Sequence, residues 1–264
     1  MAEKGWPAEH EGRQEQVALV TGASSGIGEA TAVALASAGY YVALTARRVN
    51  RLEAVAARIA ESPEGSITGE RALVLPADIT DRRAVEGVVG ACLGHWGRID
   101  LLVNNAGIMP LSALEKVRVD DWERTVDVNV KGVLFAVGSV LPTLLRQGSG
   151  HIVNISSLAG RRPFPSGAVY SATKFAVRAI SQGLRMELSA STGIRVTDIE
   201  PGVVDTELID RIEDDEARQS FQSFWKDRRP LEARDVAQAV LYAVQTPRHV
   251  NVNEILVRPT DQRT

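Results

Sequence analysis

The feature that most restricts the fold of this chain is a repeated alternation of short, continuously apolar segments with segments of helical periodicity. Four of the apolar segments, at 16–20, 40–45, 100–104 and 150–155, consist mainly of apolar residues, and each contains valine. Strands without polar alternation are typical of a sheet that is buried on both faces. Strand–helix alternation with right-handed crossovers then gives an open, doubly wound parallel sheet. We therefore predict an α/β fold with a Rossmann-like sheet and helices on both of its faces.

The pattern extends along the chain without an internal repeat or a linker. We expect strands at 16–20, 40–45, 71–76, 100–104, 150–155, 195–199 and 254–257, and helices at 27–38, 49–61, 81–96, 120–146, 169–192 and 233–245, the fourth of these split in two near 130–133. This gives a single domain at 16–264, preceded by a flexible tail at 1–15.

Composition excludes several classes of partner. The 30 basic and 33 acidic side chains give a net charge of −3, whereas nucleic-acid-binding proteins carry clustered positive charge. The longest uncharged apolar stretch, 132–145, is interrupted by Pro142 and is too short to span a bilayer. The N-terminal segment has no apolar run typical of a signal peptide. We expect no nucleic acid and no membrane as a partner.

Cysteine and histidine usage points to a reducing compartment and to no metal. Cys92 is the single cysteine, so no intramolecular disulfide can form, and we expect a small buried thiol in a cytoplasmic protein. His10, His95, His151 and His249 are scattered, and none has an acidic cluster at the spacing of metal ligands. We therefore expect surface or strand-edge histidines.

A glycine-rich turn joins the first predicted strand to the first predicted helix. The residues Thr21-Gly22-Ala23-Ser24-Ser25-Gly26-Ile27-Gly28 directly follow the strand. Glycine lets the backbone turn tightly and approach a pyrophosphate closely, and the N–H groups at the start of a helix attract anions. An ordinary tight strand–helix connection is the alternative, which the flanking strand and helix disfavour. The turn predicts a dinucleotide-binding site.

The residues after the second strand favour NADP(H) over NAD(H). An acidic residue about 20 positions beyond the glycine-rich turn would bind a free ribose 2′-hydroxyl and repel a 2′-phosphate. This chain has Arg47 and Arg48 there instead, and the guanidinium fork of Arg47 suits a phosphate. Solvated arginines at the end of a strand are the alternative.

Tyr170 and Lys174 lie four residues apart in a predicted helix, so their side chains share one face. A nearby ammonium group favours the phenolate and lowers the pKa of a tyrosine, which makes it a usable proton donor and acceptor. By itself this spacing is a common accident on helix surfaces. Ser156 and Ser157, however, end a buried strand thirteen or fourteen residues earlier, and ligands bind at the carboxyl ends of such strands.

The loop Gly22-x-x-x-Gly26-x-Gly28, the segment Asn104-Asn105-Ala106-Gly107 and the pair Tyr170-x-x-x-Lys174 together resemble the short-chain dehydrogenase/reductase family. The resemblance extends from about Gln16 to the C-terminus. It implies hydride transfer between NADP(H) and a small-molecule carbonyl/alcohol pair. It also implies a homodimer or homotetramer, in which long helices pack against their copies. Within the family, the chain resembles the branch of clavulanic-acid-type and 3-hydroxy-acid or serine dehydrogenases.

The resemblance assigns roles to individual residues. Tyr170 would be the general acid/base, Lys174 would tune it and hold the ribose, Ser157 would polarise the carbonyl, and Asn129 would complete a proton relay. Ser156 is then a structural hydroxyl, and Asn129 could instead mark a helix kink. The cofactor would contact Gly22, Ser24, Ser25, Gly26, Ile27, Gly28, Arg47, Arg48, Asp78, Ile79, Asn105, Ala106, Gly107, Tyr170, Lys174, Pro201, Gly202, Val204 and Thr206. Asp78 would contact the adenine, or else be an ordinary helix N-cap.

The charged segment 206–229 differs from the rest of the chain, because isolated aromatic residues lie among its charges. The resemblance makes it a substrate lid; a surface helical hairpin is the alternative. We expect few of its residues in the core, and we expect Phe224 and Trp225 to set substrate preference. Its acidic run 213–216 reads as a solvated helix face.

A nucleotide-sensing protein, or a subunit with vestigial activity on the same fold, is the rival function. Such proteins usually lose the tyrosine or the lysine of the pair, and this chain has both. Turnover of aldehydes or ketones discriminates between the two classes, because a sensor binds NADPH without consuming it.

Overall fold

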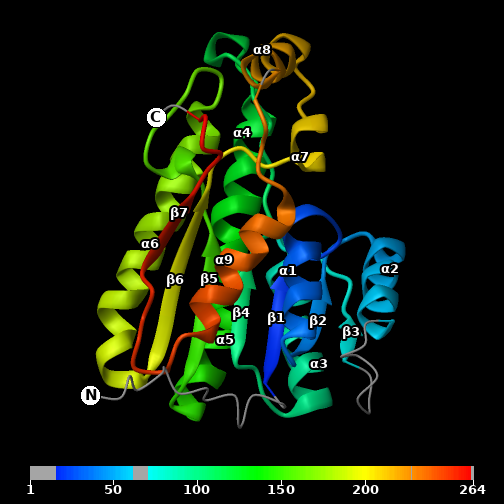
Figure 1. The fold of residues 1–264 in the computed structure, drawn as a ribbon, viewed down its shortest axis with the longest axis vertical. Helices are drawn as coiled ribbons and strands as arrows, with labels where there is room; N and C mark the ends of the chain where they lie inside the picture. The colour runs from blue at the N-terminus through cyan, green and yellow to red at the C-terminus, as the bar shows by residue number, and fades with distance from the viewer. Residues whose placement is uncertain (1–15, 62–70, 227, 263–264) are drawn as a thin grey trace, which may run out of the picture.

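The computed structural model describes residues 16–61, 71–226 and 228–262, without the side chains of Ser189, Ala190 and Phe224. The expected tail at 1–15 lies outside the described residues. The described chain forms one α/β unit in which helices cover both faces of a central sheet (Figure 1).

The sheet has seven parallel strands among the described residues, in the order β3-β2-β1-β4-β5-β6-β7. Their bounds are β1 Val17–Thr21, β2 Tyr41–Thr45, β3 Ala72–Val74, β4 Leu101–Asn104, β5 Gly150–Ile155, β6 Ile194–Pro201 and β7 Glu254–Val257. The chain builds outward from β1 to β3 and then returns to place β4 on the other side of β1. This is the doubly wound topology that the sequence predicted, and the reversal between β1 and β4 is where such sheets bind their ligands.

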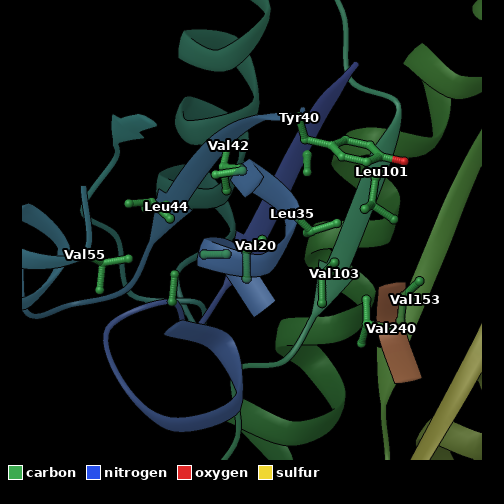
Figure 2. Packing of buried hydrophobic residues seen from close by; sticks show 14 of the residues in the cluster. Val20, Leu35, Tyr40, Val42, Leu44, Val55, Leu101, Val103, Val153 and Val240 are labelled. Carbon is green, nitrogen blue, oxygen red and sulfur yellow. The ribbon is translucent and has the colours of Figure 1, made fainter. Parts of the chain in front are cut away.

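Helices α1 (Gly26–Ser37), α2 (Val49–Ala60) and α9 (Ala233–Gln245) cover one face of the sheet, and α3 (Arg82–Trp96), α5 (Gly132–Gln147) and α6 (Ala168–Thr192) cover the other. Figure 2 shows the first core, where Val20 and Val103 of the sheet pack with Leu35, Val55 and Val240 of the three helices. Leu19, one residue before Val20, packs into the second core. Consecutive strand residues are therefore buried on opposite faces, which explains the continuously apolar strands.

The helix expected to be split near 130–133 is continuous. Helix α4 (Val119–Val126) runs through a π-helical turn, η3 (Asp127–Lys131), directly into α5, and Pro142 lies inside α5. The expected split is wrong, because a π-turn absorbs one extra residue without ending the helix. Pro142 lies within the span expected to be helical, and α5 continues past it.

The span Val119–Gln147 is the one helix in the described ranges that is long and apolar enough to cross a membrane. Its residues Val133, Ala136, Val140 and Leu144 are buried in the second core, against the sheet and α3. The span is therefore interpreted as a core helix.

Two polar residues expected at the surface are buried. His151 lies on β5, an inner strand, where its Nε2 is 2.8 Å from Oγ1 of Thr197, and burial holds its pKa well below the usual value. Asp214 is the N-cap of α8 (Asp215–Trp225): it accepts a hydrogen bond from the N–H of Ala217 and lies 2.7 Å from Nζ of Lys116. Thr197 and Lys116 are distant from these residues in the sequence, so local pattern did not reveal the burial. No group of three His, Cys, Asp or Glu side chains in the described part of the chain is placed to bind a metal.

The packing of α3 predicts an unreactive thiol. Cys92 is buried as expected, and burial together with the charge of Asp100 raises its pKa to about 12. Because the thiolate is the nucleophile, the native protein should resist iodoacetamide near neutral pH, whereas the urea-unfolded chain should take up one equivalent. Mass spectrometry measures the label taken up by the native protein and by the unfolded chain. Rapid labelling of the native protein would contradict this packing.

Candidate active site

A cavity of about 840 Å³ opens at the carboxyl edge of the sheet, between the ends of the central strands and the segment that carries α7 (Glu207–Asp210) and α8. In Figure 1 this edge faces α7 and α8 at the top of the molecule. The cavity wall includes every residue expected to contact a cofactor except Gly28. Ser157, Tyr170 and Lys174 also line it, and Asn129 does not.

The glycine-rich loop after β1 is shaped by close backbone contacts. Gly22 has a φ of +67°, and a Cβ there would lie 2.8 Å from Cα of Ala106. A Cβ on Gly28 would lie 2.3 Å from the carbonyl oxygen of Gly22. Gly28 therefore acts by letting the helix pack against the loop, which explains why it is absent from the cavity wall.

The loop after β4 braces the glycine-rich loop. The Oγ1 of Thr21 accepts hydrogen bonds from the N–H groups of Asn105 (3.0 Å) and Ala106 (3.1 Å). The side-chain amide of Asn105 donates to the carbonyl oxygens of Thr21 (3.0 Å) and Gly22 (3.2 Å). Helix α1 begins at Gly26, and its N-cap Ser25 makes no side-chain cap. Its first N–H groups therefore stay available beside the loop, as an anion site requires.

Arg48 rather than Arg47 lies against this loop. Its Nη2 donates to Oγ of Ser25 (2.7 Å) and of Ser24 (3.1 Å), and its Nη1 lies 2.8 Å from Oε2 of Glu207. The Arg47 side chain is 64% exposed, and its Nη1 is 3.9 Å from Oδ2 of Asp78. Both arginines line the cavity, but Arg48 has the fixed position.

Asp78 is not a helix cap. Its Oδ1 accepts hydrogen bonds from the N–H and the hydroxyl of Thr80, and the N-cap of α3 is Asp81. Partial burial acts to raise the pKa of Asp78, but the hydrogen bonds from Thr80 and the charge of Arg47 outweigh it, so the pKa is lowered. Asp78 thus presents a carboxylate to the cavity.

Tyr170 and Lys174 form one buried wall of the cavity. The Nζ of Lys174 donates to the carbonyl oxygen of Ile155 at 2.9 Å and lies 5.7 Å from the centroid of the Tyr170 ring. Burial raises the pKa of Tyr170 to about 12, although its hydrogen bond with Ser157 acts in the other direction. Our expectation that Lys174 lowers this pKa is therefore wrong for the protein alone, because burial dominates.

The charge of Lys174 is itself weakened by burial. Burial lowers its pKa to about 8, and the carboxylate of Asp198 opposes this shift. The ammonium form still prevails at neutral pH, but by a smaller margin than in an exposed lysine.

Asn129 lies in the π-helical turn η3, so the helix irregularity that its sequence suggested is present. Its Oδ1 accepts from the N–H of Ile108 at 2.8 Å, and its Nδ2 donates to the carbonyl oxygen of Ile108 and to Oγ1 of Thr173. A Cβ on Gly107 would lie 3.4 Å from Oδ1 of Asn129 and 3.7 Å from Nζ of Lys174. Asn129 is thus fully buried behind Gly107, close to the lysine.

Near Pro201 the cavity has apolar walls that the sequence did not predict. Tyr170 packs in a cluster with Met109, Leu111 and Ile212, against which Phe164 and Phe221 also pack. The ring centroid of Phe164 is 6.4 Å from that of Tyr170. Their sequence positions could have indicated these walls. Met109 and Leu111 come shortly after the segment 104–107, and Phe164 lies between Ser157 and Tyr170.

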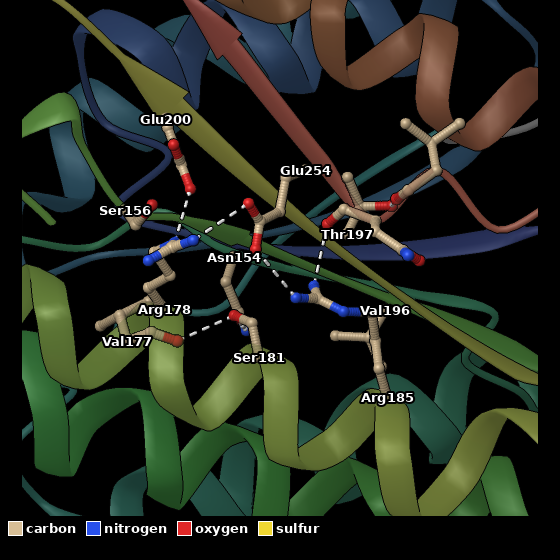
Figure 3. Close-up of polar contacts among 12 residues, drawn as sticks. Asn154, Ser156, Val177, Arg178, Ser181, Arg185, Val196, Thr197, Glu200 and Glu254 are labelled. Carbon is tan, nitrogen blue, oxygen red and sulfur yellow. Dashed lines mark hydrogen bonds and ion pairs between the residues drawn. The ribbon is translucent and has the colours of Figure 1, made fainter. Parts of the chain in front are cut away.

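Helix α6, which carries Tyr170 and Lys174, is tied to the sheet by partly buried ion pairs around the fully buried Glu200 (Figure 3). Glu200 is fully buried on β6 and pairs with Arg178 at 3.2 Å and with Arg161. Arg178 and Arg185 of α6 also pair with Glu254 of β7, at 3.4 and 3.3 Å. Removing one member of such a network leaves a buried charge without its partner, which is strongly destabilising.

Asp198 lies beside this network on β6. It pairs in register with Asn154 of β5 and with Glu254 of β7. Burial raises its pKa to about 7, and the charges of Lys174 and Arg185 act in the opposite direction. Neither Asp198 nor Glu200 was among the residues expected near the site. Their spacing of two within a strand, which puts them on one face, was the available signal.

A family model described as short chain dehydrogenase matches residues 16–217. An uncharacterized oxidoreductase from Staphylococcus saprophyticus is 45% identical over 246 residues, covering 93% of this chain and 98% of that relative. A glycine betaine reductase from Emericella nidulans is 44% identical over 247 residues, covering 94% of this chain and 19% of that much longer protein.

Solved structures match over the same range. The closed form of serine dehydrogenase complexed with NADP⁺ has a TM-score of 0.85 and 34% identity, covering 94% of this chain and 97% of that one. A 3-ketoacyl-(acyl-carrier-protein) reductase from Brucella melitensis, complexed with NADH, has a TM-score of 0.79 and 31% identity. The match covers 93% of this chain and 97% of that one. Matching structures therefore include complexes with either nicotinamide dinucleotide.

The position of Asp198 predicts a pH-dependent stability. A raised pKa means that the folded protein binds this proton more tightly than the unfolded chain does. The free energy of unfolding should therefore fall as the pH rises from about 4 to about 7. Asp198→Asn removes this loss, so it should raise Tm at mildly alkaline pH and change it little near pH 4.

Differential scanning fluorimetry measures Tm of both proteins from about pH 4 to mildly alkaline pH. Asp261→Asn, the same change at an exposed residue, is the matched control and should leave Tm unchanged at both ends. An Asp198→Asn variant that is less stable than the wild type at alkaline pH would show that the charged carboxylate stabilises the fold.

Proposed function

Because the chain belongs to the short-chain dehydrogenase family, we propose that it is an NADP(H)-dependent oxidoreductase that transfers a hydride between the nicotinamide and a small-molecule carbonyl/alcohol pair. The observation that carries the proposal is the buried set at the cavity floor: the hydrogen-bonded hydroxyls of Ser157 and Tyr170, with the ammonium of Lys174 behind them. This set fits proton transfer at an oxygen atom.

The roles of the three side chains follow from their environment. When bound, the nicotinamide supplies the hydride acceptor or donor. Since burial raises the pKa of Tyr170 to about 12, its hydroxyl is protonated at neutral pH and can donate to a carbonyl oxygen. Ser157 donates a hydrogen bond to the same oxygen. Lys174 stabilises the phenolate that remains and holds the ribose.

The loop residues fit the cofactor. The left-handed Gly22 lets the glycine-rich loop pack closely against Ala106 while it lines the cavity, and the uncapped start of α1 lies beside it; this arrangement suits a pyrophosphate. Arg48 and Arg47 at the same end of the cavity favour a 2′-phosphate over a free ribose. The NADP⁺ in the serine dehydrogenase structure supports this choice.

We assign the substrate to the apolar end of the cavity. Met109, Leu111, Phe164 and Phe221 line the cavity and pack in the cluster that contains Tyr170, which suits a carbonyl compound with an apolar substituent. The segment 206–229 would be the lid over it. Trp225 lines the cavity as a lid residue should, whereas the side chain of Phe224 lies outside the described residues.

The remaining assignments concern assembly and surroundings. Apolar side chains are exposed on the two long helices, at Leu134 and Leu145 of α5 and at Phe175 and Met186 of α6, the last at 78%. Contact between copies of these helices would cover them, so we propose a homodimer or a homotetramer. A cytoplasmic location and the absence of nucleic-acid and membrane partners belong to the same proposal.

Replacing the acid/base tests the reaction. Tyr170→Phe should lower NADPH-dependent reduction of an aldehyde and ketone panel by about a hundredfold or more, because the positioned proton donor is lost. NADPH affinity, measured by fluorescence titration, should stay the same. Tyr242→Phe, on the exposed side of α9, is the matched control. Near-normal turnover by Tyr170→Phe would require another acid. A wild type that binds NADPH but does not oxidise it with any carbonyl of the panel would instead be a sensor.

Cofactor choice is tested at the arginines. The wild type should use NADPH far better than NADH. Arg48→Ala should raise the KM for NADPH by about tenfold or more, the size of a lost charged hydrogen bond, with little effect on NADH. Arg47→Asp should further reduce the preference for NADPH over NADH. Arg58→Ala, which removes an arginine paired with Glu29 on α1, is the control. Equal use of both cofactors, unchanged by these variants, would refute the assignment.

A further inference from the structure

Glu207, the first residue of α7, lies at the point where three guanidinium groups converge. Its Oε2 is 2.8 Å from Nη1 of Arg48 and 3.0 Å from Nη2 of Arg211, and its Oε1 is 3.8 Å from Nη2 of Arg51. Glu207, Arg48 and Arg211 line the cavity. The carboxylate is therefore part of the cofactor end of the site, although it belongs to the segment at the substrate end.

Arg48 is shared between two parts of the protein. Its Nη2 binds the hydroxyls of Ser24 and Ser25 in the glycine-rich loop, at 3.1 and 2.7 Å, while its Nη1 binds Glu207. One guanidinium group therefore links the loop to α7, 159 residues away in the sequence.

A 2′-phosphate at Arg48 would meet this carboxylate. The phosphate carries about −1.5 to −2 charges near neutral pH and prefers a bidentate guanidinium contact. Glu207 is ionised there as well, because hydrogen bonding and charge from Arg48 hold its pKa below the usual value. Two anions that share one guanidinium repel each other and compete for its donors.

We propose that Glu207 is a specificity-determining residue that competes with the 2′-phosphate of the cofactor for Arg48, so that phosphate binding releases α7 from the glycine-rich loop. This inference rests on the proposed function, which places NADP(H) at Arg48.

Arg211 can keep Glu207 paired when Arg48 leaves it. Arg211 lies one turn further along from Glu207 and binds the same carboxylate oxygen as Arg48 does. When Arg48 turns to the phosphate, Arg211 keeps the carboxylate paired. Leu208 and Ile209, which follow Glu207 in α7, line the cavity near Tyr170. The adenosine end of the cofactor thereby acts on the wall of the substrate site.

Calorimetric titration with 2′,5′-ADP and with 5′-AMP tests the competition without turnover. Glu207→Gln should lower the Kd for 2′,5′-ADP by about fivefold, the effect expected from one partly exposed ion pair. The Kd for 5′-AMP should stay unchanged. Glu216→Gln removes the same charge from the same segment, at a carboxylate that pairs with Lys116 instead. This control should change neither affinity.

Hydrogen exchange on the wild type gives a second readout. The amides of α7 should exchange faster when 2′,5′-ADP is added, because the bond to Arg48 is lost, and should not respond to 5′-AMP. Protection of α7 by 2′,5′-ADP would overturn the proposal.

The outcomes separate this inference from the proposed function. Weaker binding of 2′,5′-ADP to Glu207→Gln would mean that Glu207 positions Arg48 for the phosphate, and an unchanged affinity would mean that it does not compete; both overturn the inference alone. A wild type that binds 2′,5′-ADP no better than 5′-AMP would refute the NADP(H) assignment itself, and the inference with it.

Discussion

The reversal of strand order at β1 is the constraint on which the site depends. The connection after β1 enters α1 on one face of the sheet, and the connection after β4 leads to α5 on the other face. The two loops therefore diverge at the carboxyl edge and leave room for a ligand between them. Hydrogen bonds from Asn105 and Ala106 to the Thr21 hydroxyl keep them from separating further. The glycine-rich loop and the wall formed by Tyr170 and Lys174 line one cavity because this edge is open.

The Tyr170–Lys174 pair is held from behind by polar contacts that lie outside the cavity. Arg178 and Arg185 join α6 to Glu200 and Glu254, and Asn154 donates to Ser181 at 2.7 Å. Burying charges is costly unless each has a well-placed partner, so this arrangement fixes the rotation of α6 against the sheet. That rotation decides where Tyr170 and Lys174 lie. In the same region, burial sets the pKa values of Tyr170 and Lys174, which makes packing a determinant of the proton chemistry.

The two ends of the cavity are electrostatically linked as well. Arg48 belongs to the turn after β2, and Glu207 to the segment that lies over the apolar end near Tyr170. In a cavity closed partly by charged groups, the binding of an anionic ligand rearranges existing ion pairs in addition to forming new ones. If an anionic cofactor binds at Arg48 as proposed, its recognition and the position of α7 become one equilibrium, with the guanidinium groups as its common element.

Local pattern determined the strands, most helix boundaries, the glycine-rich turn and the Ser157, Tyr170 and Lys174 set, because backbone periodicity and residue spacing are properties of neighbours in the sequence. The environments of charged and polar side chains are not fixed by neighbours in the sequence. Their burial and pairing depend on residues that only the fold brings together, such as His151 with Thr197 or Arg48 with Glu207. The sequence could show that two arginines follow β2 but not which one lies on the loop. It likewise placed a tyrosine beside a lysine, while the tertiary structure decided that burial, rather than the lysine, governs the tyrosine pKa.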